Sequence, residues 1–290
     1  MPDGEPWIAG ARLARAPVEG GLIASHVSGS GPPVVLLAPL FFDGRVWTPQ
    51  IERLEGTHTA ITVDQRGHGV SSRPAEPYDP AADVEAALTD LGVRRSAVIG
   101  MGEGAEYALR VAVRGRVDVV GLVLILPNVA WLVRELDPSR FYAGAREAIE
   151  TLNADPELAG MRDAIAALDE EAIAASITDD AQAEIPKGDS GRAVVEAMVR
   201  SNVHAVFETE FVKPGPSDLA ERLRTLVVPI LVLAASNESA DELLALVSGR
   251  LEDVRVEVIH SNVPAVTLAH PDVCNDAIVA FLSEVLPPEG

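Results

Sequence analysis

Short apolar runs alternate with helix-like segments through the first half of this 290-residue chain. The runs span residues 21–27, 33–38, 59–63, 96–99 and 119–126, and predicted helices at 46–54, 80–91 and 104–114 lie between them. The run Val34-Val35-Leu36-Leu37 contains no polar residue, as expected for a strand that is buried on both faces. This alternation predicts an α/β fold with a mostly parallel twisted sheet and helices on both faces.

The strand pattern stops between residues 128 and 213. This stretch is rich in Ala, Glu and Asp, and one predicted helix in it has an apolar side formed by Val195, Met198, Val199, Val203 and Val206. Strand–helix alternation returns after residue 226, and a last helix is predicted at 271–285, with Pro271 in its first turn. We therefore predict a core formed by residues 1–127 and 214–290, and a helical cap, or lid, formed by residues 128–213.

Residues 97–105, Ala-Val-Ile-Gly-Met-Gly-Glu-Gly-Ala, have the pattern of a strand that enters a helix through a sharp glycine-rich turn. In the pattern G-x-S-x-G such a turn holds a nucleophilic serine at the carboxyl edge of the sheet. Here the central residue is Gly102, which has no side chain. The central position requires φ > 0, which costs about 1–3 kcal/mol for a residue with a Cβ, whereas glycine adopts it freely. We therefore expect the turn to be present without its nucleophile.

Two further segments have the spacing of a known family. Residues 64–71, Asp-Gln-Arg-Gly-His-Gly-Val-Ser, are similar to its D-x-R-G-x-G-x-S turn after the fourth strand, and residues 271–282 are similar to its last helix. Together with the glycine-rich turn at residues 97–105, which we call the elbow, these segments resemble the α/β-hydrolase superfamily, in its cap-bearing branch of esterases, haloperoxidases and epoxide hydrolases. The resemblance covers nearly the whole chain and implies an α/β-hydrolase fold with an inserted helical cap.

The resemblance also implies where the catalytic residues would lie. In the family a histidine activates a serine, a carboxylate orients the histidine, and backbone N–H groups hold the oxyanion. The serine position falls on Gly102, the histidine position on Pro264, and the acid position on or near Glu238. The His-Gly pair that shapes the oxyanion loop is here Ala38-Pro39. We therefore expect a degenerate member that lacks the nucleophile and the catalytic histidine, and we expect no serine hydrolase activity.

The histidines give no replacement base and no metal site. His68 lies in the glycine-rich turn, where the resemblance implies a structural role, and His260 and His270 are expected to have surface or capping roles. His26, His58 and His204 have no motif around them. No H-x-x-H or H-E-x-x-H spacing is present, so no metal is expected. No segment matches a phosphate loop or a dinucleotide fingerprint, so no cofactor is expected either.

The strong negative charge limits the partners of this chain. With 23 Lys and Arg against 44 Asp and Glu, the formal net charge is −21, which disfavours nucleic acid and anionic membrane surfaces. The N-terminus has no signal-peptide pattern, no apolar run approaches the roughly 20 residues of a spanning helix, and the single cysteine, Cys274, excludes an internal disulfide framework. We expect a soluble cytoplasmic protein, and its oligomeric state stays open, with a homodimer as one alternative.

A cleft between core and cap is expected to bind an apolar small molecule, because such ligands bind at the carboxyl ends of parallel strands. Its predicted lining comprises Leu40, Phe41, Phe42, Met101, Gly102, Trp131, Tyr142, Glu238 and Pro264. Glu103 and Asp43 are the candidate catalytic residues, since a carboxyl group whose pKa is raised by burial can transfer protons. Glu103 is preferred because it follows Gly102 directly, although the first turn of a helix also favours a negative charge for structural reasons.

Three functional hypotheses remain open. The first is a non-hydrolytic enzyme that isomerises, cyclises or eliminates by acid/base chemistry. The second is a non-catalytic pseudoenzyme that binds a hydrophobic ligand or a partner, and the third is a hydrolase with an unrecognised set of residues. Carboxyl groups that converge on a closed cavity would favour the first hypothesis, and a purely apolar cavity would favour the second.

Overall fold

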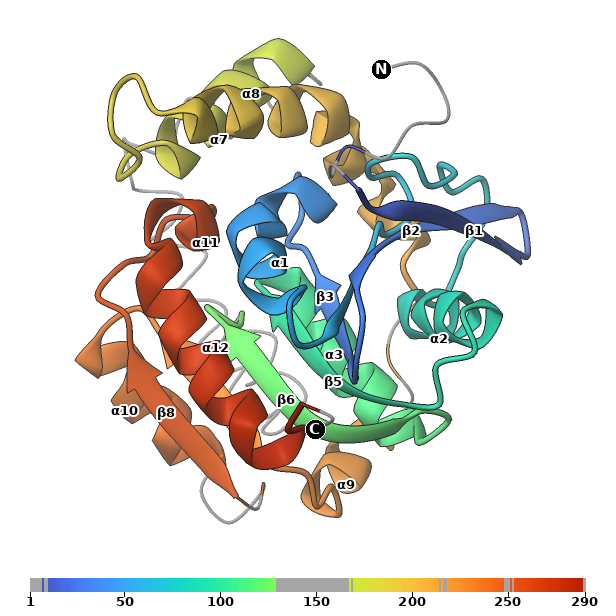
Figure 1. Cartoon of the computed structure of the whole chain (residues 1–290). Helices are drawn as coiled ribbons and strands as arrows, with labels where there is room; N and C mark the ends of the chain where they lie inside the picture. Colours follow the sequence, from blue (N-terminus) through green and yellow to red (C-terminus); the bar gives the residue numbers. More distant parts are fainter. Residues whose placement is uncertain are drawn as a thin grey trace.

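In the described part of the chain, eight strands form one sheet at the centre of the molecule (Figure 1). The computed structural model describes residues 7, 10–128, 167, 169–213, 215, 218–247, 251 and 253–288. The strands are β1 (Arg12–Val18), β2 (Gly21–Gly29), β3 (Pro33–Leu37), β4 (Thr59–Val63), β5 (Arg95–Met101), β6 (Asp118–Ile125), β7 (Ile230–Ala234) and β8 (Val254–Val258). Their order is β1-β2-β4-β3-β5-β6-β7-β8, and only the β1–β2 and β2–β4 pairs are antiparallel. The predicted mostly parallel sheet is confirmed.

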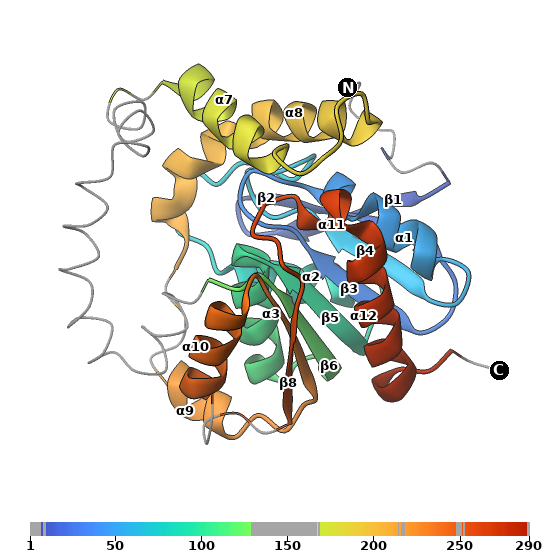
Figure 2. The same cartoon turned by 90° about the vertical axis from the view of Figure 1, so that its left-hand side faces the viewer.

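Helices cover both faces of this sheet (Figures 1 and 2). The core helices are α1 (Thr48–Leu54), α2 (Pro80–Asp90), α3 (Glu103–Arg114), α9 (Leu219–Arg224), α10 (Asn237–Val247), α11 (Val266–Ala269) and α12 (Pro271–Val285), and a 3-10 turn, η1 (Gly44–Trp47), precedes α1. Alternate residues of β3 point to opposite faces. Val34 and Leu36 pack in the hydrophobic cluster that contains α1 and α12, whereas Val35 and Leu37 pack in the cluster that contains α2 and α3.

Local signals in the sequence fix the ends of several helices. The side chain of Asp79 accepts a hydrogen bond from the N–H of Ala81 at 3.0 Å and so caps α2, whose first residue is Pro80. Pro271 likewise begins α12, and the predicted helix at 271–285 is confirmed. α3 ends at Arg114, and the next residue, Gly115, caps it with φ +66°, a conformation that glycine takes without strain.

The strand β1 (Arg12–Val18) is not predicted from the sequence. It lies at the edge of the sheet and pairs only with β2 among the described strands. Its sequence Arg-Leu-Ala-Arg-Ala-Pro-Val carries charges and a proline, and most of its residues are partly or fully exposed. Charged residues and proline are common on edge strands, where they oppose pairing with other chains. Such a strand therefore lacks the continuous apolar run by which the buried strands are recognised.

In the segment predicted to form the cap, the described elements are α7 (Glu170–Ala181), α8 (Ser190–Asn202) and a 3-10 helix, η2 (Val203–Phe211), and we use the word cap for these three elements. Figure 2 shows α7 and α8 lying across the top of the core. Val195, Met198 and Val199 of α8 are fully buried and belong to the same hydrophobic cluster as Phe42 and Trp47 of the core. The predicted apolar side of this helix is thus the face that packs on the core. The boundaries at residues 128 and 213 stay a prediction.

His26, on β2, is a buried histidine whose two ring nitrogens have no hydrogen-bond partner among the described residues. Its ring stacks on that of Trp7, with the centroids 4.3 Å apart. Burial lowers the pKa of His26 from its usual 6.5 to about 4, against a smaller raising effect of Asp43. Between these two pH values the unfolded chain binds a proton that the folded protein does not, so His26 lowers the stability as the pH falls.

We expect His26→Phe to raise the free energy of unfolding, because it removes two unsatisfied nitrogens and keeps a ring against Trp7. The increase should be about 2 kcal/mol larger at pH 5 than at pH 7.5. Below the usual pKa of histidine, protonation of His26 stabilises the unfolded wild-type chain by about 1.36 kcal/mol per pH unit, and the variant lacks this effect. Urea unfolding at the two pH values measures the difference. Equal gains at both would contradict a neutral, buried His26.

Candidate functional site

The elbow between β5 and α3 has the backbone geometry that the sequence predicts. Gly102 adopts φ +55° and ψ −118°, and its N–H donates to the carbonyl oxygen of Ile125 at 2.9 Å. A Cβ on Gly100 would overlap the backbone of Gly104, and a Cβ on Gly104 would overlap the carbonyl oxygen of Leu37. These glycines therefore allow the helix to approach the sheet closely enough to form the turn.

Pro39 fills the space beside Gly102. A Cβ on Gly102 would lie 2.9 Å from the Cβ of Pro39, well inside the separation of about 3.5–4.0 Å at which carbon atoms pack. A serine at this position would therefore need Pro39 to move. Pro264 is half buried between β8 and α11, and Glu238 is exposed on the first turn of α10. The three positions where the resemblance implies a triad thus hold a glycine, a proline and an exposed carboxylate.

Glu103, the residue after Gly102, lies at a small cavity. The volume of this cavity is about 10 Å³, which is the space of a single water molecule. Among the described residues it is lined by Leu40, Gln65, Arg66, His68, Tyr78, Glu103, Tyr107, Ala205, Glu208, Thr209 and Val212. Most of these side chains are polar, whereas the sequence predicts a largely apolar lining. Two acidic residues, Glu103 and Glu208, are among these lining residues.

The carboxyl group of Glu103 is held by Tyr107. The Tyr107 hydroxyl donates to Oε1 of Glu103 at 2.7 Å, and the two residues lie one turn apart on the same face of α3. Burial raises the pKa of Glu103, against smaller lowering effects of this hydrogen bond and of the Arg110 guanidinium. Glu103 therefore keeps its proton to a higher pH than an exposed glutamate, which brings its pKa closer to the range that proton transfer requires.

Glu208 and Tyr78 also line this cavity. Glu208 lies on η2 of the cap, and its Oε1 accepts a hydrogen bond from Nε of Arg73 at 2.5 Å. Its Oε2 is buried and has no partner among the described atoms. Burial raises the pKa of Tyr78, and the nearby Glu103 raises it further. Tyr78 therefore stays protonated and remains a hydrogen-bond donor at physiological pH.

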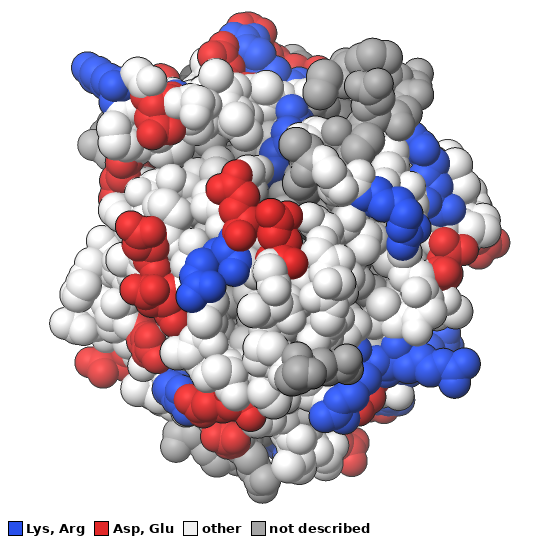
Figure 3. All heavy atoms as spheres, viewed as in Figure 1, with Lys and Arg blue, Asp and Glu red and all other residues white. Residues whose placement is uncertain are grey.

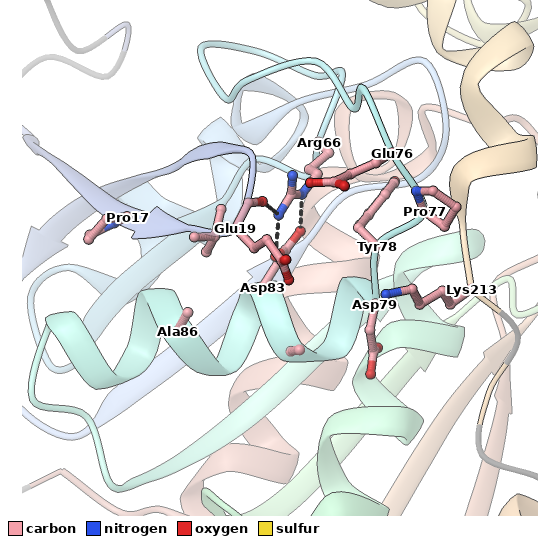
Figure 4. A pocket seen from close by; sticks show the side chains of 12 residues that line it. Pro17, Glu19, Arg66, Glu76, Pro77, Tyr78, Asp79, Asp83, Ala86 and Lys213 are labelled. Carbon is pink, nitrogen blue, oxygen red and sulfur yellow. Dashed lines mark hydrogen bonds and ion pairs between the residues drawn. The ribbon is translucent and has the colours of Figure 1, made fainter.

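Arg66 and Tyr78 also border a second hollow of about 340 Å³, which lies between β1 and α2 (Figure 4). Figure 4 shows the Arg66 side chain between Glu19 and Asp83. Its Nε donates to Oδ2 of Asp83 at 2.6 Å, and its Nη2 donates to the carbonyl oxygen of Glu19 at 2.6 Å. The guanidinium carbon lies 5.0 Å from the centre of the Tyr78 ring. Arg66 therefore fixes the wall that separates the two hollows.

His68 is held by the backbone through both ring nitrogens. Its Nε2 accepts from the N–H of Phe41 at 3.3 Å, and its Nδ1, taken as protonated from this network, donates to the carbonyl oxygen of Arg66 at 3.0 Å. Burial lowers the pKa of His68 to about 4, so the ring is neutral at neutral pH. Phe41 adopts φ +72°, and the contact with His68 helps to hold it there. These contacts favour a structural role for His68.

The predicted lining residues of the core lie in different environments. Leu40 lines the cavity at Glu103. Phe42 and Met101 are buried within the hydrophobic cluster that the cap covers, and Phe41 packs against the same cluster. Trp131 and Tyr142 lie outside the described residues. The structure thus brings Leu40 to Glu103 and places Phe42 and Met101 in the core.

Asp43 is fully buried but does not line this cavity among the described residues. Its carboxylate accepts hydrogen bonds from Nε and Nη2 of Arg45 at 2.8 and 2.6 Å, and from Nδ2 of Asn202 at 3.0 Å. It also caps η1 through the N–H of Arg45. Asp64 lies nearby, and burial together with the charge of Asp43 raises the pKa of Asp64. These contacts engage Asp43 in joining the cap to the core.

Tyr107, Tyr78 and Glu208 are lining residues that are not predicted from the sequence. Tyr107 carries a usable signal, because a residue four positions after Glu103 on a predicted helix shares its face. Tyr78 and Glu208 lie in a loop and in the cap, and no motif marks either of them. Their approach to Glu103 depends on how the cap packs on the core.

The described residues contain neither a candidate metal centre nor a candidate membrane-spanning helix. No group of three or more His, Cys, Asp or Glu side chains there is placed to hold a metal ion, and no helix there is long and apolar enough to cross a membrane. Figure 3 shows acidic and basic side chains interspersed over one face of the molecule. Cys274 is buried, and burial raises the pKa of its thiol to about 12.

The chain is similar to known proteins over most of its length. A relative from Mesorhizobium japonicum, 2-(acetamidomethylene)succinate hydrolase, is 25% identical over 262 residues, which cover 88% of this chain and 89% of the relative. A bromoperoxidase from Bacillus anthracis has a similar structure, with a TM-score of 0.68, 20% identity, and coverage of 94% of this chain and 100% of its own. For a carboxylesterase from Bacillus subtilis the TM-score is 0.66 at 17% identity, with coverage of 96% and 93%. Residues 34–277 match the model of the alpha/beta hydrolase family, and the chain therefore belongs to that family.

Proposed function

We propose that this protein is a non-hydrolytic enzyme that moves protons on a small molecule bound between core and cap, with Glu103 as the acid/base. The observation that carries the proposal is the placement of Glu103. Its carboxyl group is buried directly after the elbow, at a cavity, with Tyr107 holding one oxygen and burial raising its pKa. A carboxyl group in this state is suited to take and return a proton near neutral pH.

Hydrolysis through a covalent acyl-enzyme is disfavoured by three features of the same site. Gly102 offers no nucleophile, Pro39 occupies the space where a serine Cβ would lie, and Pro264 has no proton to exchange. A nucleophile without a base contributes little, because the two act as a unit. The family relationship therefore supports the fold and the place of the site, and the residues present support a different reaction.

The residues present support proton transfer next to a carbonyl group. Glu103 as carboxylate would remove a proton from the carbon beside the carbonyl, and the electron pair left behind would move onto the carbonyl oxygen. Tyr78, whose raised pKa keeps it protonated, is a donor for that oxygen. Return of the proton to another carbon gives an isomer, and loss of a leaving group from the neighbouring carbon gives an elimination. No covalent bond to the protein is needed.

A non-catalytic ligand-binding protein is the second candidate. The observation that favours it is the size of the cavity, about 10 Å³ in the described residues, which admits no more than a water molecule. For either function the cap has to move away from the core before a small molecule can bind at this cavity. The polar lining, with two carboxyl groups and two phenols, favours the catalytic proposal over this one.

The proposal is tested by deuterium incorporation from D₂O into two small ketones, acetone and cyclohexanone, followed by proton NMR. Wild type is expected to accelerate the exchange, and Glu103→Gln to lower the acceleration by about 100-fold or more, the usual contribution of a general base. The rate should rise with pH as Glu103 loses its proton, with a midpoint above that of an ordinary glutamate.

Glu52→Gln is the matched control, since Glu52 is exposed on α1 and lies outside the cavity lining. Equal exchange rates for wild type and Glu103→Gln would refute a catalytic role for Glu103. A fluorophosphonate probe and p-nitrophenyl acetate provide a second measurement, for which we expect neither labelling nor hydrolysis. Labelling of wild type would instead support the hydrolase with an unrecognised residue set.

A further inference from the structure

One edge of the central sheet is the strand β8, which pairs only with β7 among the described strands. Figure 2 views the molecule from the side of β8 and shows α10 on one side of this strand and α12 on the other. The backbone groups on the outer side of an edge strand form a template on which a strand of another chain can pair. The outer side of β8 is therefore a candidate interaction surface.

The ladder between β7 and β8 fixes which backbone groups of β8 point outward. The N–H of Ile259, directly after β8, donates to the carbonyl oxygen of Ala234 on β7 at 2.9 Å. Successive residues of a strand direct their backbone groups to opposite sides of the strand, so the odd-numbered residues of β8 face β7. The N–H and C=O groups of Val254, Val256 and Val258 therefore point away from the sheet.

The sequence of β8, Val-Arg-Val-Glu-Val, is complementary to itself in an antiparallel pairing. When Val256 lies opposite Val256 of a second copy, Arg255 of each chain lies opposite Glu257 of the other. Opposite charges directly across two antiparallel strands attract each other, and like charges repel. The two neighbouring registers that keep the outward groups paired place Arg255 opposite Arg255, or Glu257 opposite Glu257. The register centred on Val256 is therefore the favoured one.

The side chains of β8 suit this pairing. Arg255 and Glu257 are exposed, whereas the three valines are half-buried and pack against the cluster that contains Ala240 and Leu243 of α10. The guanidinium of Arg255 donates to the carboxylate of Glu284 on α12 at 2.9 and 3.1 Å. Because a guanidinium has five N–H donors, it can bind a second carboxylate as well. A second strand beside β8 would also cover the exposed part of the valines.

The opposite edge of the sheet, formed by β1, lacks this complementarity. β1 carries Arg12 and Arg15 and contains no acidic residue, so two copies of β1 have no opposite charges to pair. Pro17 in the same strand has no N–H to donate to a neighbour. The residues of β1 therefore oppose pairing with another copy, and those of β8 favour it.

We propose that two copies of this chain associate through their β8 strands, paired antiparallel about Val256, so that one continuous sheet runs through the dimer. Both copies contribute the same surface, as a two-fold interface requires. Arg255 of each copy pairs with Glu257 of the other and sets the register, and the outward N–H and C=O groups hold the strands together. This assembly is independent of the reaction proposed for Glu103.

The first test reverses the charges and measures the mass of the protein by sedimentation velocity over a series of concentrations. Wild type is expected to reach the mass of two chains. Arg255→Glu and Glu257→Arg each place like charges opposite each other, and each should raise the dissociation constant of the dimer by about tenfold to 100-fold. An equimolar mixture of these two variants restores both opposite-charge pairs, so the mixture should dimerise where neither variant does so alone.

Asp90→Arg is the matched control for a change of charge away from β8. Asp90 is exposed at the end of α2, and α2 packs on β1 and β2 at the other side of the sheet. This variant is expected to dimerise as wild type does.

The second test determines the register by a disulfide between copies. Residues that form a hydrogen-bonded pair across antiparallel strands have Cα atoms about 5.5 Å apart, which a disulfide can span. Oxidised glutathione should therefore link two chains of Val256→Cys. Val254→Cys is the matched control, because in this register residue 254 would lie about 14 Å from its copy and should not be linked. The native Cys274 is buried and is present in both variants.

Three results would each overturn the proposal. The first is a wild type that keeps the mass of one chain up to about 100 μM, since a specific interface of micromolar affinity would be occupied there. The second is a mixture of Arg255→Glu and Glu257→Arg that dimerises no better than either variant alone. The third is equal linking of Val256→Cys and Val254→Cys. Circular dichroism and thermal unfolding of each variant establish that folded proteins are compared.

Discussion

Gly102→Ser is expected to lower the free energy of unfolding by about 2–6 kcal/mol and to leave ester hydrolysis at background. The first cause is the backbone, since φ at residue 102 is +55°, a region that a residue with a Cβ adopts only under strain. The second is the contact with Pro39, whose Cβ would lie 2.9 Å from the new Cβ. Urea unfolding and p-nitrophenyl acetate hydrolysis measure the two parts of the prediction.

Two control variants separate these causes. Pro39→Gly combined with Gly102→Ser removes the contact and should recover the part of the loss that comes from overlap, whereas the backbone strain stays. Pro39→Gly alone provides the reference for the effect of losing the proline. Hydrolysis should stay at background in all three proteins, because residue 264 is still a proline. If Gly102→Ser has the same free energy of unfolding as wild type, the prediction is wrong, and Pro39 moves aside without cost.

The buried strands are the part of the fold that the sequence predicts best. Every residue from Val34 to Leu37 is fully buried in β3, and six of the seven residues of β5 are buried. A strand covered on both faces consists mostly of apolar residues, so its sequence indicates it. β1 escapes prediction for the opposite reason, since an edge strand with exposed positions tolerates charges and a proline.

The place of the site is predictable, but its lining is only partly so. Glu103 follows from the elbow, because the turn itself places the next residue at the carboxyl end of β5. Phe42 and Met101 lie near the same edge, yet they are buried in one hydrophobic cluster with the apolar face of α8 and so become part of the core. The sequence shows that α8 has an apolar face and does not show which core residues that face will bury.

Glu208 shows where a single sequence stops being informative. Its partner Arg73 and its neighbour Gly67 lie in the loop between β4 and α2, while Glu208 itself lies on η2 of the cap. No helical or strand periodicity in the sequence relates Glu208 to Arg73 or Gly67. Their contact follows from the packing of the cap on the core, which depends on many weak apolar contacts at once.

Arg66→Met is expected to lower the free energy of unfolding by about 3–5 kcal/mol, the usual effect of removing one partner of a buried ion pair. The Arg66 side chain is 3% exposed and that of Asp83 is 10% exposed, so the variant leaves a carboxylate in a poorly hydrated place. The deficit should become smaller as the pH falls, because burial already raises the pKa of Asp83 and the guanidinium that opposes this effect is lost. Urea unfolding between pH 5 and pH 8 measures both the deficit and its slope.

The double variant Arg66→Met/Asp83→Leu decides whether the deficit comes from the unpaired charge. Replacing a buried pair by apolar side chains is often close to neutral, so the double variant should be more stable than Arg66→Met alone. A residual loss of about 1 kcal/mol is expected from the carbonyl of Glu19, which loses the donor at Nη2. The single variant Asp83→Leu completes the comparison. If the losses in Arg66→Met and Asp83→Leu add up to the loss in the double variant, Arg66 and Asp83 do not interact. Non-additive losses would instead show that Arg66 and Asp83 stabilise the protein as a pair, and Arg66 also packs over the ring of Tyr78 at the cavity.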